Sequence, residues 1–182
     1  LQYLYGANTA YNAGDTTYTF NDGEKYFETI WDGGGTDTID YTSSSTGAFI
    51  DLREGNSSSL GQPLVFTNTF GVTQYTDSRT VWIAYDAEIE NAWGSQSDDT
   101  IYGNRLKNEI SGWEGNDKIR GGSGDDVLRG DGGDDQIKGN GGNDTLIGGA
   151  GIDLLIGGSG DDLYIINGAT EIDKFLTDDG ID

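Results

Sequence analysis

Residues 94 to 165 repeat every nine positions, as eight consecutive nonapeptides without an insertion or a deletion. The first residue of every unit is Gly, the sixth is Asp in seven units and Asn in one, and the eighth is always Ile, Leu or Tyr. A fixed short period is typical of solenoids, in which each unit packs on its neighbours. The repeat therefore predicts a stacked fold with a thin core for this part of the chain.

The composition limits what can hold such a fold together. Apolar residues make up 34% of the 182 residues, and the chain has 31 Gly and a net charge of −22. An aperiodic chain of this kind would stay disordered, because little apolar surface offsets the entropy of ordering. The negative charge argues against binding to nucleic-acid phosphates and to anionic membrane surfaces. Cations are the expected partners.

Missing residue types and segments exclude further classes. The chain has no Cys, so neither disulfides nor thiolate metal sites contribute. No apolar run approaches the roughly 18 residues that span a bilayer. The first residue is Leu and no signal peptide follows, so we expect a processed product or an excised fragment. The Gly-rich turns lack the Lys of a phosphate-binding loop, and paired Asp as glycosidase acids are disfavoured because metal would saturate them.

The repeat predicts how the coils are built. The last three residues of each unit are strand-like and the preceding six form a Gly-rich turn, so that two units make one coil. Residues 18 apart then lie above one another at the strand spacing of about 4.8 Å. The eighth-position side chains are expected to point inward as the core: Ile101, Ile110, Ile119, Leu128, Ile137, Leu146, Leu155 and Tyr164. The predicted fold is all-β, a parallel β-roll or β-solenoid.

The same stacking predicts metal sites. Carboxylates one strand spacing apart repel unless a cation lies between them, and Ca²⁺ accepts about six to eight oxygen ligands. The pattern G-G-x-G-x-D-x-U-x also matches the calcium-binding RTX repeat. The predicted ligands are the sixth-position side chains in two columns, Asp99, Asp117, Asp135 and Asp153 on one edge and Asn108, Asp126, Asp144 and Asp162 on the other. Backbone carbonyls are added by the fourth-position glycines Gly115, Gly124, Gly133, Gly142, Gly151 and Gly160.

The predicted sites differ in quality. The pairs Asp117/Asp135, Asp126/Asp144, Asp135/Asp153 and Asp144/Asp162 follow the pattern best. Asn108/Asp126 is expected to be weaker because Leu106 replaces a Gly and an amide replaces a carboxylate, and Asp99/Asp117 is in doubt because Ser97 replaces a Gly. The fifth-position acids Asp98, Asp125, Asp134 and Asp161 are expected to supply local charge rather than coordination. We expect on the order of four to eight Ca²⁺ ions, with binding coupled to folding because the apolar core is small.

The remaining residues predict a less regular β structure. Residues 16–20, 36–41, 48–52 and 81–85 are short β-rich runs separated by Gly and Asn turns, and residues 54–77 are expected to form an exposed loop or excursion. This gives three parts: an irregular β region at 1–93, the roll at 94–165, and a cap or the start of a truncated tail at 166–182.

Motifs outside the repeats carry a family resemblance. L-Y-G-A-N at residues 4–8, Y-N-A-G-D-T at 11–16, W-D-G-G-G-T-D-T-I-D at 31–40 and I-E-N-A at 89–92 resemble, over nearly the whole chain, the C-terminal domain of serralysin-type secreted metalloproteases, peptidase family M10. The resemblance implies two further Ca²⁺ sites. One would use Asn12, Gly14, Thr16, Asp32, Gly34 and Asp37, and the other Gly35, Asp37, Glu90 and the carbonyl of Glu88.

The resemblance also frames the functional hypotheses. Family members carry a zinc protease domain with a His-Glu-x-x-His helix, but this chain has no His, so it is not expected to be an enzyme. The leading hypothesis is a secreted, extracellular bacterial module that folds on Ca²⁺ and serves type I secretion and stability of a metalloprotease. The alternative is a calcium-dependent polysaccharide or cell-surface binding module, suggested by Trp113 and by the bases Arg105, Lys107, Lys118, Arg120, Arg129 and Lys138. These bases could instead only soften repulsion between coils.

Overall fold

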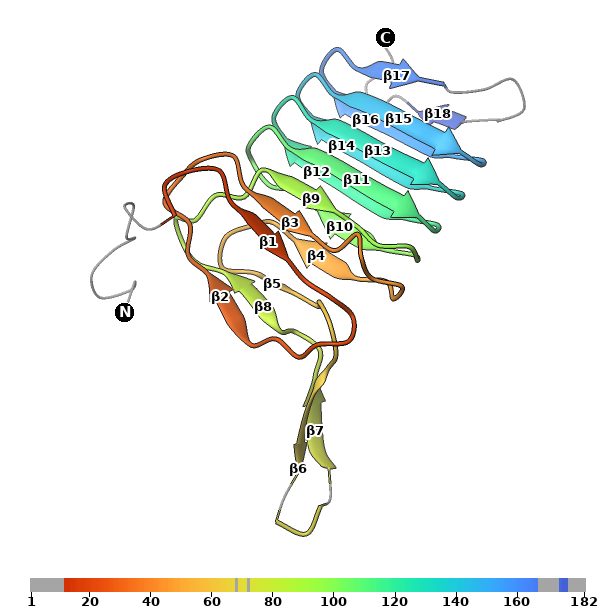
Figure 1. Cartoon of the computed structure of the whole chain (residues 1–182). Coiled ribbons are helices and arrows are strands. Elements are labelled where there is room, and N and C mark those ends of the chain that lie inside the picture. Colours follow the sequence, from red (N-terminus) through yellow and green to blue (C-terminus); the bar gives the residue numbers. More distant parts are fainter. Residues whose placement is uncertain (1–11, 68, 72, 167–173, 177–182) are drawn as a thin grey trace.

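The computed structural model describes residues 12–67, 69–71, 73–166 and 174–176. Every regular element in these ranges is a β-strand, and none is a helix that could cross a membrane (Figure 1). The strands are β1 (Thr17–Thr19), β2 (Glu28–Ile30), β3 (Thr38–Asp40), β4 (Phe49–Asp51), β5 (Ser57–Ser58), β6 (Leu64–Thr67), β7 (Thr73–Asp77), β8 (Val81–Ile83), β9 (Asn91–Trp93), β10 (Thr100–Tyr102), β11 (Glu109–Glu114), β12 (Lys118–Ser123), β13 (Val127–Gly132), β14 (Gln136–Gly141), β15 (Thr145–Ala150), β16 (Leu154–Ser159), β17 (Leu163–Ile165) and β18 (Lys174–Leu176).

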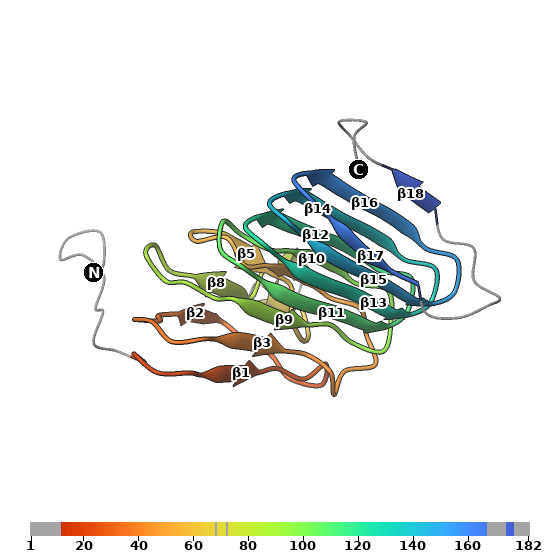
Figure 2. The same ribbon diagram turned by 90° about the horizontal axis from the view of Figure 1, so that it is seen from above.

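Two parallel sheets form the layers of the roll, one over the other (Figure 2). The seven-stranded sheet has the order β1-β3-β9-β11-β13-β15-β17, and the six-stranded sheet has the order β18-β16-β14-β12-β10-β4. Within the repeats, neighbouring strands pair with residues 18 apart, as in Ile101↔Ile119 and Leu128↔Leu146. This register confirms the predicted parallel β-roll with two units per coil.

The strands are longer than the repeat pattern predicted. β11 to β16 each contain six residues, because the first three positions of the next unit continue the strand. Gly122 and Ser123, for example, pair with Asn140 and Gly141 one coil later. The expectation of three-residue strands and six-residue turns was therefore wrong. Positions four to six alone form the turn, and the glycines of positions one to three serve close packing between coils.

The core is a narrow line of side chains between the two sheets. The eighth-position residues from Ile101 to Leu155 are at most 1% exposed, as predicted, whereas Tyr164 is only partly buried against them. The line continues beyond the repeats, since Ile39 pairs in register with Ala92, and Ile50 with Ile101. All of these apolar residues are buried, so the packing runs without a break from residue 39 into the repeat.

The N-terminal half contributes strands to both sheets. The β-rich runs expected at 16–20, 36–41, 48–52 and 81–85 contain β1, β3, β4 and β8. β8 lies in a separate sheet of order β2-β8-β5. The excursion expected at 54–77 contains β5 and the antiparallel hairpin β6–β7, which stands away from the roll (Figure 1).

The ends of the chain are described only in part. β18 pairs in parallel with β16 and so extends the six-stranded sheet at its last edge. The rest of the cap expected at 166–182 lies outside the described residues after position 166. The motif at residues 4–8 and the first residue of the motif at 11–16 also lie outside them.

Candidate metal sites

The turns bring the sixth-position side chains together in two columns. In each column, one carboxylate oxygen accepts a hydrogen bond from the backbone N–H of the sixth-position residue one coil earlier. The N–H group of Asp117 donates to Oδ1 of Asp135 at 2.8 Å, and that of Asp126 donates to Oδ1 of Asp144 at 2.9 Å. The same bond joins Asp99 to Asp117, Asn108 to Asp126, Asp135 to Asp153, and Asp144 to Asp162.

The second carboxylate oxygen of these Asp side chains takes no part in these hydrogen bonds. Oδ2 is buried and has no hydrogen-bond partner among the described residues in Asp117, Asp126, Asp135, Asp144 and Asp162. A buried carboxylate oxygen without a partner destabilises the folded state, and a bound cation can supply the missing partner. The orphaned oxygens recur along both columns after the first residue of each, so the structure provides a regular series of buried oxygens that a hard cation could bind.

Each orphaned oxygen faces the first glycine of its own unit. A Cβ atom built on Gly139 would lie 2.1 Å from Oδ2 of Asp144 and 2.6 Å from the carbonyl oxygen of Gly157. Gly130 has the same surroundings, with Oδ2 of Asp135 at 1.9 Å and the carbonyl oxygen of Gly148 at 2.5 Å. A carboxylate and a carbonyl oxygen therefore converge where only glycine leaves room. The sequence marked this position by its invariant Gly, but we had not predicted the first-position carbonyls as part of the site.

The fourth-position glycines stack on one another along the turns. All six, from Gly115 to Gly160, have positive φ between 108° and 136°, a backbone region that favours glycine. A Cβ atom on Gly133 would lie 2.0 Å from the carbonyl oxygen of Gly115, and the same close approach recurs from Gly124 to Gly142 and from Gly133 to Gly151. The carbonyl oxygens of Gly115, Gly124 and Gly133 therefore lie against the glycine of the next turn, and their role as ligands stays a prediction.

Burial weakens four of the sixth-position acids in the absence of a cation. It raises the pKa of Asp117 to about 8 and that of Asp144 to about 6, with the neighbouring carboxylates adding to the effect. Burial likewise raises the pKa of Asp126 and of Asp135 to about 7. Near neutral pH, protons and cations therefore compete for the same oxygens.

The first residue of each column differs from the rest. Asn108 accepts a hydrogen bond at Oδ1 from the N–H of Asn104 at 2.9 Å, and its Nδ2 donates to the carbonyl of Glu90 at 2.9 Å. Asp99 accepts from the N–H groups of Ala48 and Ser95 on its two oxygens. Both side chains already have hydrogen-bond partners, among them Ala48 and Glu90 of the N-terminal half, which gives a physical reason to expect weaker metal sites there.

The fifth-position residues form a second, outer column that sequence reasoning missed. Oδ1 of Asp125 accepts from the N–H of Asn143 at 2.8 Å, and Oδ1 of Asn143 accepts in turn from the N–H of Asp161 at 2.8 Å. Asp98, Asn116, Asp134 and Ile152 form the equivalent series on the other edge. These acids are turn-to-turn hydrogen-bond acceptors as well as local charges. Asp or Asn at this position in six of the eight units was the available signal.

The residues implied for a first site ahead of the roll meet around Asp37. Asp37 is fully buried, its Oδ1 accepts from the N–H of Thr16 at 2.8 Å, and its Oδ2 has no hydrogen-bond partner in the described ranges. Burial raises the pKa of Asp37 to about 7, and the nearby carboxylates of Asp32 and Glu90 raise it further. Gly35 packs so closely on Gly14 that a Cβ atom would lie 2.6 Å from the Gly14 carbonyl carbon.

Tyr18 ties this loop together and was not predicted. Its hydroxyl donates to Oδ2 of Asp32 at 2.6 Å and accepts from Nδ2 of Asn12 at 3.0 Å. Burial and the hydrogen bond to Asp32 raise the pKa of Tyr18 well above its usual value, so the hydroxyl stays protonated. The other oxygen of Asp32 accepts from the N–H of Gly34 at 2.9 Å, and Thr16 donates to the Gly14 carbonyl at 2.9 Å. Tyr18 lies outside the sequence motifs at residues 11–16 and 31–40, so no pattern indicated its role.

The residues implied for the second site are only partly brought together. Oε2 of Glu90 accepts from the N–H of Asp37 at 2.8 Å, and burial raises the pKa of Glu90. The Glu88 carboxylate instead forms an ion pair with Arg105 at 2.6 Å, which leaves the Glu88 carbonyl as the implied ligand. Across the described residues, no group of three or more acidic side chains is close enough to hold a metal. An ion at any of these places would take most of its ligands from backbone carbonyls.

Comparison with known proteins agrees with this geometry. Residues 87–117, 111–146 and 138–165 match the RTX calcium-binding nonapeptide repeat family. Serralysin of Proteus mirabilis is 35% identical over 122 residues, which are 60% of this chain and 22% of that protein. Metallopeptidase AprA of Pseudomonas marginalis is 35% identical over 60% of this chain and 23% of its own length. The resemblance thus covers less of the chain than its motifs had suggested, and the chain spans about a fifth of the length of these relatives.

Proposed function

We propose that this chain, which carries an RTX domain resembling that of serralysin-type proteins, folds when it binds Ca²⁺ outside the cell. The observation that carries the proposal is the series of buried Asp oxygens without a hydrogen-bond partner, each facing a glycine whose place no larger side chain could take. Ca²⁺ suits these sites because it accepts carboxylate and carbonyl oxygens in flexible geometry.

We assign the ligands to the two columns of turns. The proposed set consists of the sixth-position side chains together with the fourth-position carbonyls. We add to this proposal the first-position carbonyls of Gly130, Gly139, Gly148 and Gly157, which lie beside the first-position glycines one coil earlier. Asp32 and Asp37 with Asn12, Gly14, Thr16 and Gly34 would form one site ahead of the roll. Gly35, Asp37, Glu90 and the Glu88 carbonyl would form the other.

Calcium would act as a folding switch. The metal-free chain has a net charge of −22 and must bury carboxylates in register at each turn. Each bound Ca²⁺ cancels two of these charges and supplies the missing partner of an Asp oxygen. Ions that bind only the folded state add their binding free energy to its stability. A chain of this kind stays unfolded where Ca²⁺ is scarce and folds where Ca²⁺ is abundant.

This switch suits a protein that leaves a bacterial cell unfolded. We therefore propose a role in type I secretion and in stabilising a secreted protein, whose further part would be a zinc metalloprotease. The chain itself would serve as the non-catalytic part, since it has no His to bind zinc in the manner of such enzymes. We keep the division into an irregular β region, a roll and a C-terminal cap as part of this proposal.

Circular dichroism and size-exclusion chromatography of the whole chain would test the proposal. In excess chelator we expect a coil spectrum and a large hydrodynamic radius, and addition of millimolar Ca²⁺ should produce a β spectrum and a compact particle. Mg²⁺ at the same concentration is the control and should not replace Ca²⁺, because it demands stricter octahedral geometry. A compact β spectrum in chelator would overturn the proposal.

A further inference from the structure

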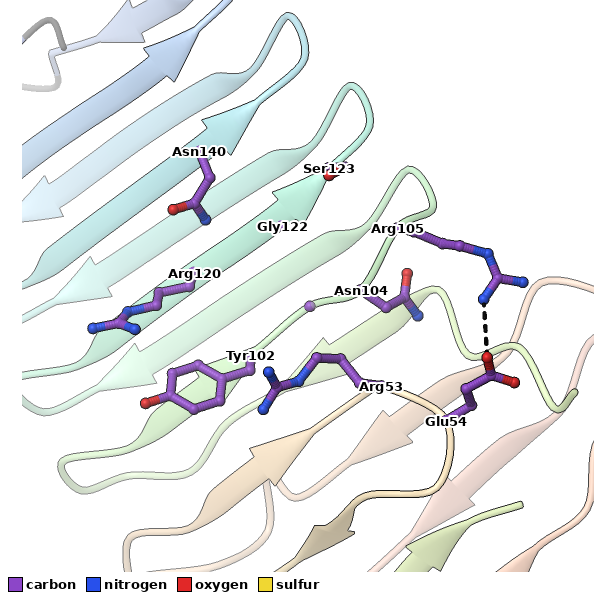
Figure 3. A pocket seen from close by; sticks show the side chains of 10 residues that line it. Arg53, Glu54, Tyr102, Asn104, Arg105, Arg120, Gly122, Ser123 and Asn140 are labelled. Carbon is purple, nitrogen blue, oxygen red and sulfur yellow. Dashed lines mark hydrogen bonds and ion pairs between the residues drawn. The ribbon is translucent and has the colours of Figure 1, made fainter. Parts of the chain in front are cut away.

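The outer face of the six-stranded sheet carries a groove that none of the proposed calcium sites uses. It has a volume of about 540 Å³ and lies across β4, β10, β12 and β14 (Figure 3). Its polar lining includes Arg53, Tyr102, Arg120, Ser123 and Asn140, and no aliphatic side chain lines it. We call these five residues the arginine groove.

Two guanidinium groups flank one aromatic ring at its centre. Cζ of Arg53 and Cζ of Arg120 each lie 5.3 Å from the centroid of the Tyr102 ring. The order of strands β4, β10 and β12 puts Tyr102 between the other two residues, as Figure 3 shows. Two cations therefore lie against this ring, which disfavours the stacking of a neutral sugar on it.

The pairing of the two arginines differs. Arg53 binds both oxygens of Asp51 through Nε and Nη2, at 2.8 and 2.6 Å, which leaves its Nη1 group without a partner in the described part of the chain. Arg120 is exposed and forms neither an ion pair nor a hydrogen bond with any described residue. In a chain with 32 acidic residues and only 10 basic ones, a guanidinium group held against a ring and unpaired with any of the described carboxylates is unexpected.

Softening of repulsion between coils does not explain Arg120. Its ninth position is in the middle of β12, whereas the sixth-position acids lie in the turns. Arg129, at the ninth position of the next unit, faces outward from the other sheet and pairs with Glu109 at 2.7 Å. The comparison shows that a ninth-position Arg can reach a carboxylate of this protein, and that Arg120 does not.

Neutral donors line the same groove. The Tyr102 hydroxyl, the Ser123 hydroxyl and the Asn140 side-chain amide have no hydrogen-bond partner among the described residues. The lining carboxylate of Glu54 is paired with Arg105 at 3.5 Å. A smaller groove shares Tyr102 and Arg120 and adds Lys118, Gln136 and Lys138 along the next strands, together with Thr100, Ile119 and Ile156. Basic and amide side chains thus lie on adjacent strands, separated by the strand spacing of about 4.8 Å.

We propose that the arginine groove binds an acidic polysaccharide, with Arg120 holding a uronic acid carboxylate. The planar guanidinium fork matches a carboxylate in bidentate geometry, and the hydroxyl and amide groups match sugar hydroxyls. The absence of aliphatic lining disfavours an acidic peptide, since peptide sites gain affinity from apolar side-chain pockets. The inference rests on the proposed function in one respect, that Ca²⁺ must assemble the strands carrying the groove.

Calorimetric titration of the whole chain in Ca²⁺ with a short oligomer of a hexuronic acid would test this assignment. A neutral hexose oligomer of the same length and a polyglutamate peptide serve as comparison ligands. We expect the uronic acid oligomer to bind and the other two to bind at least about tenfold more weakly. Equal binding of polyglutamate, or no binding of the uronic acid oligomer to a folded chain, would overturn the proposal.

Two matched variants separate the groove from general charge. Arg120→Gln should raise the Kd at least about tenfold, because it removes a charge-assisted bidentate contact. Arg129→Gln removes the same charge from the opposite sheet and should leave the Kd unchanged. Equal effects would mean that the ligand is held by Ca²⁺ bridges or by overall charge, and the assignment would fail. If Arg120→Gln does not fold, Arg120→Lys keeps the charge without the fork and should still weaken binding.

The β spectrum recorded in the same buffer distinguishes the two proposals. A chain that stays unfolded in Ca²⁺ would contradict the proposed folding switch. A folded chain that ignores the uronic acid oligomer would contradict only the arginine groove.

Discussion

Asp135 lies in the middle of one turn column, so its side chain is a proposed ligand or neighbour of two calcium sites, one with Asp117 and one with Asp153. Its N–H donates to Oδ1 of Asp153 at 2.8 Å, and its own Oδ1 accepts from the N–H of Asp117 at 2.8 Å. Asp135→Asn keeps the shape and the hydrogen bond at Oδ1. It removes the negative charge and replaces the buried Oδ2 by an NH₂ group close to the Gly148 carbonyl.

The expected loss depends on Ca²⁺. A site bound at about 100 times its Kd adds about 2.7 kcal/mol to stability, so loss of two adjacent sites would remove about 5 kcal/mol. Without Ca²⁺ the effect of the substitution on stability changes sign. Burial raises the pKa of Asp135 to about 7, so the buried, ionised carboxylate destabilises the metal-free fold. Asp135→Asn should therefore destabilise the chain in Ca²⁺ and leave the metal-free chain unchanged or slightly more ordered.

Asp134→Asn is the matched control. Asp134 is exposed, and its Oδ1 accepts from the N–H of Ile152 at 2.9 Å, a bond that an Asn side chain makes in the same column at Asn116. Urea unfolding in millimolar Ca²⁺ and the midpoint of the Ca²⁺ titration should shift strongly for Asp135→Asn and hardly for Asp134→Asn. Equal shifts for the two variants would refute the reasoning from the orphaned oxygen.

Three further predictions follow from the same geometry. The pKa of Asp117 is raised to about 8 and that of Asp126 to about 7, above the unfolded value of about 3.9, so the metal-free fold loses stability as pH rises through 7 to 8 and gains it as pH falls. Because the metal-free chain is unfolded and its carboxyl groups are ionised above about pH 5, Ca²⁺ displaces almost no protons between pH 8 and pH 5.5. The Ca²⁺ midpoint measured by circular dichroism should therefore stay nearly constant over this range, and a steep rise towards pH 5.5 would mean that a folded, protonated chain exists without Ca²⁺. Gly139→Ala places a Cβ atom 2.1 Å from Oδ2 of Asp144 and should raise the Ca²⁺ midpoint, whereas Gly141→Ala, whose nearest neighbour is Oγ of Ser159 at 3.4 Å, should not. Ile137→Ala empties a fully buried core position and should cost about 2 to 5 kcal/mol in urea unfolding at saturating Ca²⁺, with a loss below 1 kcal/mol arguing against a packed core.

The period of the sequence was enough to predict the register of the roll. Once residues 18 apart stack, Ile119 must lie on Ile101 and Asp135 on Asp117, and both alignments are present. The strand length was not predictable in this way. Gly, Ser and Asn at positions one to three resemble turn residues, yet they pair as strands because the neighbouring coils offer a backbone ladder.

The repeat pattern could not predict the contacts between segments that are distant in the sequence. Tyr18 joins Asn12 to Asp32 only because β1 and β3 pair, and Arg53 reaches Tyr102 only because β4 pairs with β10. The hydrogen bond that Asp99 accepts from Ala48 depends on the same meeting of the two halves. A repeat predicts contacts within itself, whereas its junction with another segment depends on tertiary packing.

Amide hydrogen exchange across a Ca²⁺ titration tests the central claim most directly, because it reports on β11 to β16 strand by strand. If ions between the turns hold the roll together, these six strands should exchange freely in chelator and become protected together over the range in which Ca²⁺ binds. Strong protection of β11 to β16 in chelator, unchanged by Ca²⁺, would contradict the account.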